Sequence, residues 1–523
     1  MDENKQAPFT ALSPTPMEPS SPFTAQLYTN YVPTSAEAEQ IRNDIILPAE
    51  SEILQLDAQV DDLHRHRDIL AERVASHKSL VSLPRRLAPE IIRHIFLECL
   101  PDAGDAVMSP TCAPLKLGRI CGTWRTIALQ TQELWSCIHI SLGFLRADER
   151  RLDALEEWLQ RSQLPLSLTI VGNHPPNGRE DGALIPRMMN ILLGSSHRWH
   201  RLELSNFNDP CIERLADADA PMLEIVTLRD EFENIPDFNI LHGTRLTEVT
   251  LLASLLSFQP AIFVCPAAET LRHLSLSATS PTTFGLRPDV FLDALKRHSQ
   301  LVSLVIQIDH RDGWSGHDVV HLPHLESFRM INTFTCDISL IVAMLSLLIL
   351  PDLVHFDMPP TTFAQADYPL FNDFFTRTTK LRSISLYLAS FTDYALVETL
   401  KLIPTITSLS VVATIEGSPP PPTNAAHPDS LLTMLSRPSE PLVCPALTSF
   451  EILDCPTLSE GVLMSFLRAR IVPEQHCFRS LRVGFLRAAP IIRPDLGFLN
   501  STGVEVELIF EPGVSASHGY REA

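Results

Sequence analysis

The chain lacks several features that mark well-known protein classes. It has no basic surplus, since 41 Lys and Arg stand against 62 Asp and Glu, and the net charge of −21 argues against nucleic-acid binding. Its ten cysteines form no CxxC pair, as in a reduced intracellular protein. No signal-peptide core begins the chain. The most apolar run, residues 338–350, has 13 residues and is too short for a membrane span of about 20. We therefore expect a soluble protein of the cytoplasm and/or nucleus, with neither nucleic acid nor membrane as a partner.

Motifs of catalysis are also missing. The chain contains no Walker loop, GxGxxG or GxSxG. His310-Arg311-Asp312 copies a tripeptide of the kinase catalytic loop, but the other kinase motifs are absent. Cys112 and Cys121 have no second pair nearby that would complete a zinc site. We expect no catalytic residues, no metal, no cofactor and no enzymatic activity.

Composition divides the chain into regions. Residues 1–35 carry six prolines among Ser and Thr and are expected to be disordered, as are residues 511–523. With 45% apolar residues, the remainder is long enough to bury large cores.

A heptad pattern follows the tail, within a helix expected over residues 36–79. Apolar residues recur at alternating steps of three and four, with two polar interruptions: Ile53, Leu56, Val60, Leu63, Arg67, Leu70, Val74 and His77. A helix with such a narrow apolar seam is only marginally stable alone in water, so the seam is expected to pack against a partner. Either a second copy supplies it, in a parallel or antiparallel homodimer, or the helix folds back onto the following domain.

Residues 136–510 repeat the phrase LxxLxL eleven times, as in Leu223-Val226-Leu228 and Leu381-Ile384-Leu386. The steps are 23 to 31 residues, apart from one of 41 that holds the insert EGSPPPPTNAAHP. Helical patterns lie between copies, and Trp135-Ile138-Ile140 is expected to be an entry strand. One strand and one helix per unit predict an α/β solenoid of irregular leucine-rich repeats. An ordinary α/β domain is the alternative.

Residues 80–135 are expected to form two or three short helices with more apolar surface than so small a module can bury. Leu87-Ala88-Pro89-Glu90-Ile91-Ile92 is followed by Ile95-Phe96, and then by Ile120-Cys121-Gly122-Thr123-Trp124-Arg125 and Leu134-Trp135. This order resembles the F-box motif, and the preceding heptad helix resembles fungal F-box proteins with a leading coiled coil. Ala88 stands where proline is common, and the insert PDAGDAVMSPTCA lengthens the loop between the helices.

The resemblance implies a small all-α F-box module that docks onto the Skp-family linker of a cullin–RING (SCF-type) ubiquitin ligase. It would make the chain a substrate-recruiting adaptor, whose solenoid binds a protein substrate of unknown identity. By carry-over, ten residues would contact the linker: Leu87, Pro89, Glu90, Ile91, Ile95, Phe96, Leu115, Ile120, Trp124 and Leu134. The alternative is a leucine-rich-repeat interaction scaffold without ubiquitin transfer.

Residues beside the apolar strand positions are expected to face the concave side of the solenoid, where a substrate would bind. They are Arg201, Glu203, Arg229, His273, Arg329, His355, Asp357, Tyr387 and Glu451. Their charge is mixed. The net charge of −15 over residues 136–523 favours a basic partner through electrostatic steering, although solubility explains it equally well.

Overall fold

The computed structural model describes residues 21–81, 83–101, 105–146, 148–172, 184–206, 210–229, 238–253, 269–278, 288–308, 318–332, 338–358, 370–414, 425–437, 443–456, 458–471, 477–486, 499 and 502–510. The chain divides into two compact units, Met1–Ile91 and Ile92–Ala523. Of the tails expected to be disordered, residues 1–20 and 511–523 lie outside the described residues, as does His310-Arg311-Asp312. Residues 21–35 of the first tail are described, and they contain the 3-10 turn η1 (Thr24–Gln26) and the first residue of α1.

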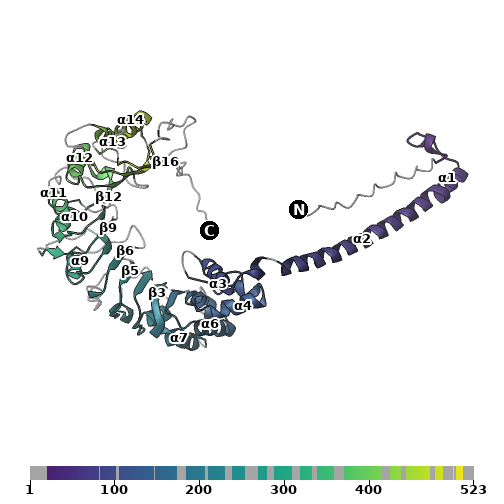
Figure 1. The fold of residues 1–523 in the computed structure, drawn as a ribbon, viewed down its shortest axis with the longest axis horizontal. Helices are drawn as coiled ribbons and strands as arrows, with labels where there is room; N and C mark the ends of the chain where they lie inside the picture. Colours follow the sequence, from purple (N-terminus) through teal and green to yellow (C-terminus); the bar gives the residue numbers. More distant parts are fainter. Residues whose placement is uncertain are drawn as a thin grey trace, which may run out of the picture. The chain divides into compact units, whose positions relative to one another are not determined.

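The first unit is dominated by one continuous helical stretch (Figure 1). Thr34 caps it: its hydroxyl accepts from the Glu37 backbone N–H, and the Glu37 carboxylate accepts from the Thr34 N–H. The stretch runs through α1 (Ser35–Ile41), a π-helical turn η2 (Arg42–Ile46) and α2 (Leu47–Leu80). The predicted helix is therefore present. Every described side chain of α2 is exposed.

The helical module after α2 contains α3 (Pro89–Glu98), the 3-10 turn η4 (Leu117–Arg119), α4 (Gly122–Gln130) and η5 (Gln132–Trp135). Pro89 is the first residue of α3, where its missing N–H costs no hydrogen bond. Phe96 of α3 packs edge-on against Trp124 of α4, with ring centroids 5.1 Å apart. The indole Nε1 of Trp135 donates to the Ala128 carbonyl of α4 at 2.8 Å. These contacts close a small core, as the sequence predicts.

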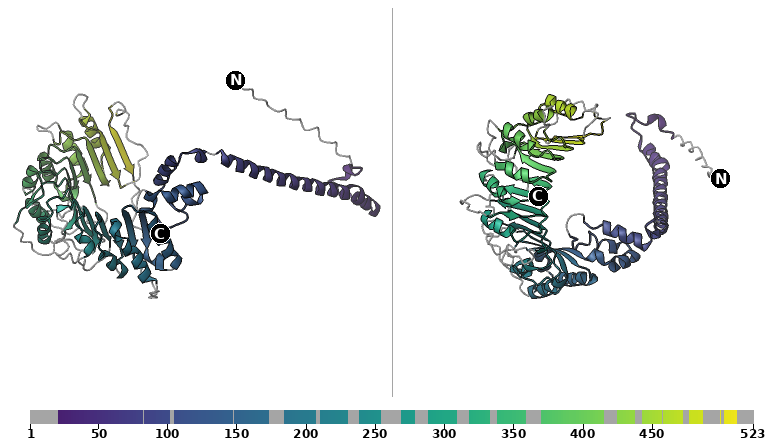
Figure 2. Two further views of the ribbon diagram at one scale, coloured as in Figure 1. Left: turned by 60° about the horizontal axis from the view of Figure 1, so that its bottom comes forward. Right: turned by 60° about the vertical axis from the view of Figure 1, so that its left-hand side comes forward.

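The second unit is built on one parallel sheet, with fourteen described strands in sequential order. Figure 2 shows that the sheet curves, with the strands on its inner side and the helices on its outer side. The strands are β1 (Cys137–Ser141), β2 (Leu166–Val171), β3 (Trp199–Ser205), β4 (Ile225–Arg229), β5 (Glu248–Ala253), β6 (His273–Ala278), β7 (Ser303–Ile308), β9 (Ser327–Asn332), β11 (His355–Asp357), β12 (Ser383–Tyr387), β13 (Ser408–Val412), β14 (Ser449–Cys455), β15 (Ser480–Phe485) and β16 (Glu505–Phe510). This arrangement confirms a solenoid of parallel strands with helices between them.

Ten described helices accompany the sheet. They are α5 (Leu142–Arg146), α6 (Glu149–Arg161), α7 (Ile185–Gly194), α8 (Pro210–Ala216), α9 (Pro288–Leu295), α10 (Ile338–Ser346), α11 (Leu370–Arg377), α12 (Asp393–Lys401), α13 (Pro428–Ser436) and α14 (Glu460–Arg470). A small second sheet pairs β8 (Val320–His321) with β10 (Leu348–Ile349). The apolar run at 338–350 lies in α10 and β10, where Ile341, Met344 and Leu348 are buried. It is core, as predicted.

The LxL pairs form the buried rows of the sheet. Phe328, Phe356 and Ile384 lie side by side on adjacent strands, and all three are buried. The residues between them alternate to the opposite face, because successive side chains of a strand point to opposite sides. All eleven LxxLxL copies and the entry strand coincide with strands. Two strands of the large sheet do not fit the pattern, because Pro165 and Gly503 stand where the first leucine would precede β2 and β16.

Threonines join successive turns of the solenoid. The Thr270 hydroxyl donates to the Leu246 carbonyl at 2.8 Å, and the Thr405 hydroxyl donates to the Leu381 carbonyl at 2.9 Å. Thr448 bridges to the Thr407 carbonyl at 2.8 Å in the same way. The repeats lack a regular asparagine at these turns, and hydroxyl groups of neighbouring turns satisfy backbone carbonyls there instead.

The loop after α3 covers part of the first edge of the sheet. The His139 N–H of β1 donates to the Ala106 carbonyl at 2.7 Å. The Asp105 carboxylate accepts from the hydroxyls of Ser167 and Thr169 on β2, both at 2.9 Å. A solenoid needs a cap where its first repeat would otherwise expose the core. The loop insert that departs from the F-box pattern therefore has a structural role, because it supplies part of that cap.

Burial predicts unequal reactivity among the cysteines. Burial raises the pKa of the Cys444 thiol from 9.0 to about 12, so at pH 8.5 its thiolate is roughly a thousandfold scarcer than that of an ordinary cysteine. Cys99 and Cys112 are exposed. We expect iodoacetamide to label Cys99 and Cys112 well before Cys444, which should stay unlabelled until the protein is unfolded, as followed by mass spectrometry. Labelling of Cys444 at the rate of Cys112 in the native protein would contradict this.

Candidate functional site

The first candidate surface is the apolar face of the helical module. Ile91 and Ile95 are four residues apart in α3, so they share one face of that helix, and they are 51% and 36% exposed. Ile120, which directly follows η4, is 56% exposed. Leu87, Leu115 and Trp124 are partly exposed, while Pro89 and Glu90 are exposed. Eight of the ten residues assigned to linker contact are thus accessible in the chain alone.

The other two residues, Phe96 and Leu134, require a correction. Both are fully buried, with 0% of their surface exposed. Phe96 lies one residue after Ile95, and this shift of about 100° around the helix turns its ring toward Trp124 and away from solvent. These two side chains hold the module together and cannot touch a partner directly. The sequence motif includes residues that are exposed and residues that are buried in the module, and it does not distinguish the two groups.

The second candidate surface is the concave face of the sheet. All nine residues assigned to it alternate with buried strand positions and therefore lie on one face. The structure brings some of them together in ion pairs. Arg229 Nε lies 2.8 Å from Glu203 Oε1, and Arg329 Nε lies 2.6 Å from Asp357 Oδ2. These four charges are largely satisfied within the sheet.

The remaining assigned residues lie apart from one another. Arg201, His273 and His355 share one row of the sheet but are separated by intervening strands, and they make no side-chain hydrogen bond or ion pair within the described residues. Burial raises the pKa of the Tyr387 phenol, as do the charges of Asp454 and Asp357, so its hydroxyl remains a donor at neutral pH. The guanidinium of Arg201, the two imidazoles and the Tyr387 hydroxyl are therefore available to hydrogen-bond a ligand.

Sequence reasoning missed part of this surface. Arg482 Nη1 lies 3.1 Å from Glu451 Oε1, and Arg482 Nε lies 3.3 Å from Glu507 Oε2. Arg482 stands between the second and third apolar residues of its repeat, as Glu451 does, so the same rule identifies it. A row of small hydroxyls extends beside these charges, formed by Ser383, Ser408, Ser449 and Ser480 on four adjacent strands. This part of the surface is thus polar, with charged side chains and hydroxyls on neighbouring strands.

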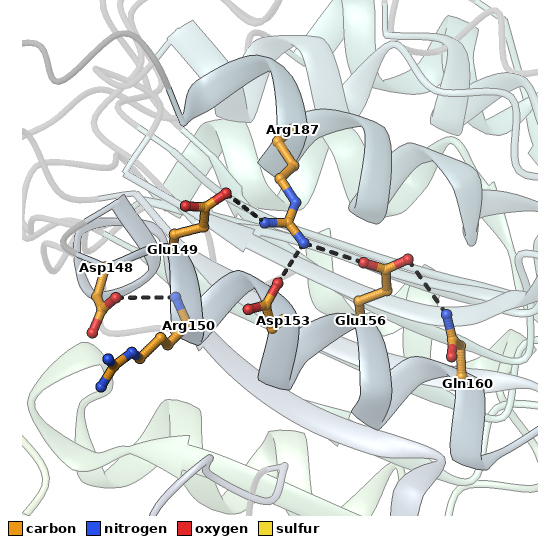
Figure 3. A network of polar contacts seen from close by, with 7 residues as sticks. All are labelled: Asp148, Glu149, Arg150, Asp153, Glu156, Gln160 and Arg187. Atoms are coloured by element: carbon orange, nitrogen blue, oxygen red, sulfur yellow. Dashed lines mark hydrogen bonds and ion pairs between the residues drawn. The ribbon is translucent and has the colours of Figure 1, made fainter.

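A third polar cluster lies on the helical side (Figure 3). Arg187 of α7 reaches three carboxylates of α6: Glu149 at 3.1 Å, Asp153 at 2.5 Å and Glu156 at 3.5 Å. Its hydrogen bond to Asp153 is the largest cause that raises the pKa of Arg187. A groove of about 520 Å³ lies beside it, lined by residues of both helices. Because the guanidinium is already paired, this cluster ties two adjacent repeats together.

The described part of the chain contains no group of three or more His, Cys, Asp or Glu side chains placed to hold a metal ion. Within the same residues, no helix has both the length and the apolar character needed to cross a bilayer.

No family model matches the chain, and no curated protein does either. Among solved structures, the chain is similar to one in the Rad7 and Elc1 complex from yeast, at 15% sequence identity and a TM-score of 0.35, over 81% of this chain and 94% of that one. It is also similar to a chain of the TLR13–ssRNA13 complex, at 12% identity and a TM-score of 0.34, over 67% of this chain and 49% of that one. TM-scores this low carry no conclusion about this chain.

Proposed function

We propose that the chain is a substrate-recruiting adaptor of a cullin–RING ubiquitin ligase. In this proposal the helical module is an F-box that docks onto a Skp-family linker, and through it onto a cullin. The leucine-rich-repeat-like solenoid holds a protein substrate on its concave face. The chain itself performs no bond chemistry, and it acts inside the cell, where its partners are.

The accessible apolar face of the module carries this proposal. Ile91, Ile95 and Ile120 are large aliphatic residues that a self-sufficient module would bury, yet each leaves a third or more of its surface in water. They occupy positions that match the F-box motif, while Phe96 and Leu134 keep the module folded from within. A module that stays bound to a partner requires exposed apolar side chains for the interface and buried side chains for its own core, and these residues are divided in that way.

The concave face supports the second half of the proposal. Its free polar ends and hydroxyl rows suit hydrogen bonding with a protein surface. A chain that binds the linker through its helical module and a substrate through its solenoid would hold a substrate lysine near the ubiquitin-loaded enzyme. This would raise the effective concentration of that lysine there.

A binding measurement with a purified Skp-family linker tests the docking. We expect the full chain to bind the linker, and Ile95→Asp together with Ile120→Asp to weaken the dissociation constant by about a hundredfold or more, because two charges would enter an apolar contact. Isothermal titration calorimetry measures this. Both side chains are exposed, so circular dichroism should show that the variant stays folded.

Val319→Asp is the matched control, since Val319 is 54% exposed but belongs to the solenoid. It should bind the linker as the natural chain does. A natural chain that fails to bind, or a double variant that binds equally well, would reject the adaptor function.

An interaction scaffold without ubiquitin transfer is the second candidate, because an exposed docking face does not by itself imply catalysis by a ligase. Proteins captured by the Ile95→Asp, Ile120→Asp variant serve as candidate substrates. If the reconstituted ligase with the natural chain ubiquitinates one of them, the adaptor is supported. If linker binding is present but no captured protein is modified, the scaffold is supported.

A further inference from the structure

We infer that α2 forms an antiparallel two-stranded coiled coil with a second copy of this chain. This inference concerns assembly and does not depend on the ligase function. It starts from a seam along α2, in which Ile53, Val60, Arg67 and Val74 take heptad position a, and Leu56, Leu63, Leu70 and His77 take position d.

The seam is uncovered in the single chain. Every described side chain of α2 is exposed, and Ile53, Leu56, Val60 and Leu63 each leave about half or more of their surface in water. A helix of 34 residues draws most of its stability from packing of its apolar face. Apolar residues at six of the eight a and d positions are the pattern by which helices pair into a coiled coil.

The charges of α2 are divided between its two halves. Residues 47–62 hold five acidic residues and no Lys or Arg. Residues 63–80 hold four Lys or Arg and only two acidic residues. Glu50, Glu52, Arg73 and Lys78 make no ion pair within the described residues, so these charges remain available to a partner. Two copies running in opposite directions would place each acidic half beside a basic half.

A parallel pair conflicts with the flanking charges. In a parallel coiled coil, position g of one helix lies beside position e of the next heptad in the other. Glu52 would then lie beside Asp57 of the second copy, and Arg73 beside its Lys78. Each contact occurs twice by symmetry, so four like-charge pairs would form. Like charges at such positions destabilise the pair.

An antiparallel pair removes this conflict. In the register that sets Leu56 against Val74 and Val60 against Leu70 of the second copy, positions e face each other and positions g face each other. Glu50 then lies beside Lys78 of the second copy, twice by symmetry. No Asp or Glu faces another at these positions, and no Lys or Arg faces another.

The orientation decides where the two chains leave the coiled coil. At 1.5 Å per residue, this register separates the two Leu80 ends by about 45 Å. A parallel pair would instead release both chains at the same end. The antiparallel pair therefore presents two separate copies of everything that follows α2, as bivalent capture requires.

The first experiment tests the seam by the mass of the purified full chain in light scattering. We expect twice the chain's 58.3 kDa for the natural protein. Leu56→Asp should give a monomer, because a charge would enter the seam. Leu54→Asp is the matched control, since Leu54 lies nearby on α2 but outside the seam, and it should remain dimeric. A monomeric natural chain, or a dimer that survives Leu56→Asp, would overturn the inference.

The second experiment tests the orientation by the dimer dissociation constant in analytical ultracentrifugation. In the antiparallel pair, Lys78→Glu sets glutamate against Glu50 and should weaken the dimer about tenfold. Adding Glu50→Lys to the same chain should restore it. In a parallel pair, Lys78→Glu would face Arg73 and strengthen the dimer instead, which would overturn the antiparallel arrangement. Linker binding by these variants should stay at the natural level, so a failure of one proposal is distinguishable from a failure of the other.

Discussion

Phe356→Ala is expected to lower the free energy of unfolding by about 3–5 kcal/mol. Phe356 lies on β11, fully buried, at the centre of an aromatic cluster. Its ring centroid is 5.8 Å from that of Phe328, 5.2 Å from that of Phe374 and 6.3 Å from that of Phe375. Alanine would remove contacts to one neighbouring strand and to α11 together, and the cavity would lie between stacked repeats.

The position of Phe356 makes its loss more than local. In a solenoid each repeat is stabilised by the interfaces with its neighbours, so a weak interface in the middle can divide the array. Urea denaturation followed by circular dichroism measures the loss, and a second transition would show that the array has divided. Val319→Ala, at an exposed position, should change stability by less than about 0.5 kcal/mol. A change below about 1 kcal/mol for Phe356→Ala would contradict the proposed central position of this side chain.

Arg470→Ala is expected to lower the free energy of unfolding by about 2–4 kcal/mol. Arg470 is the last residue of α14 and is buried, and burial lowers the pKa of its guanidinium. Its Nη1 donates to the Cys444 carbonyl at 3.0 Å, and its Nη2 donates to the Val443 carbonyl at 2.8 Å. Alanine would leave two buried carbonyls without these donors and would open a cavity beside β14.

Arg377→Ala is the control with matching chemistry. Arg377 also donates to two backbone carbonyls, those of Asp373 at 2.8 Å and Ser346 at 3.0 Å, but it is exposed, so water can replace it. Its loss should cost less than about 1 kcal/mol. Thermal unfolding of both variants measures the difference. If the two variants were equally stable, burial would not be the reason for the effect at Arg470.

The two candidate surfaces were predictable to different degrees. The concave residues follow from alternation alone, because a strand turns every second side chain to the same face. The rule extends to Arg482, which sequence reasoning passed over. Their ion pairs were not predictable in the same way: Arg329 and Asp357 hold equivalent positions of consecutive repeats on paired strands, but alternation alone does not say that the two side chains turn toward each other.

The motif of the helical module predicted its apolar residues but not their division into core and surface. Ile95 and Phe96 are adjacent and equally apolar, and only the direction of α3 against α4 decides that one contacts Trp124 while the other faces water. The Asp105 contacts with β2 are a further case, because a loop insert carries no periodic signal that would place it at the edge of the sheet.

Local periodicity in the amino-acid order was sufficient for the strands, the parallel solenoid and the long helix, since each depends on which side chains repeat along a short stretch. Partnerships between distant side chains depended on packing in three dimensions: the ring of Phe356 in its cluster, the guanidinium of Arg470 at its carbonyls and the burial of Leu134. The physical reason is that burial and pairing are properties of neighbours in space, and the repeat pattern specifies neighbours only along the chain and from one strand to the next.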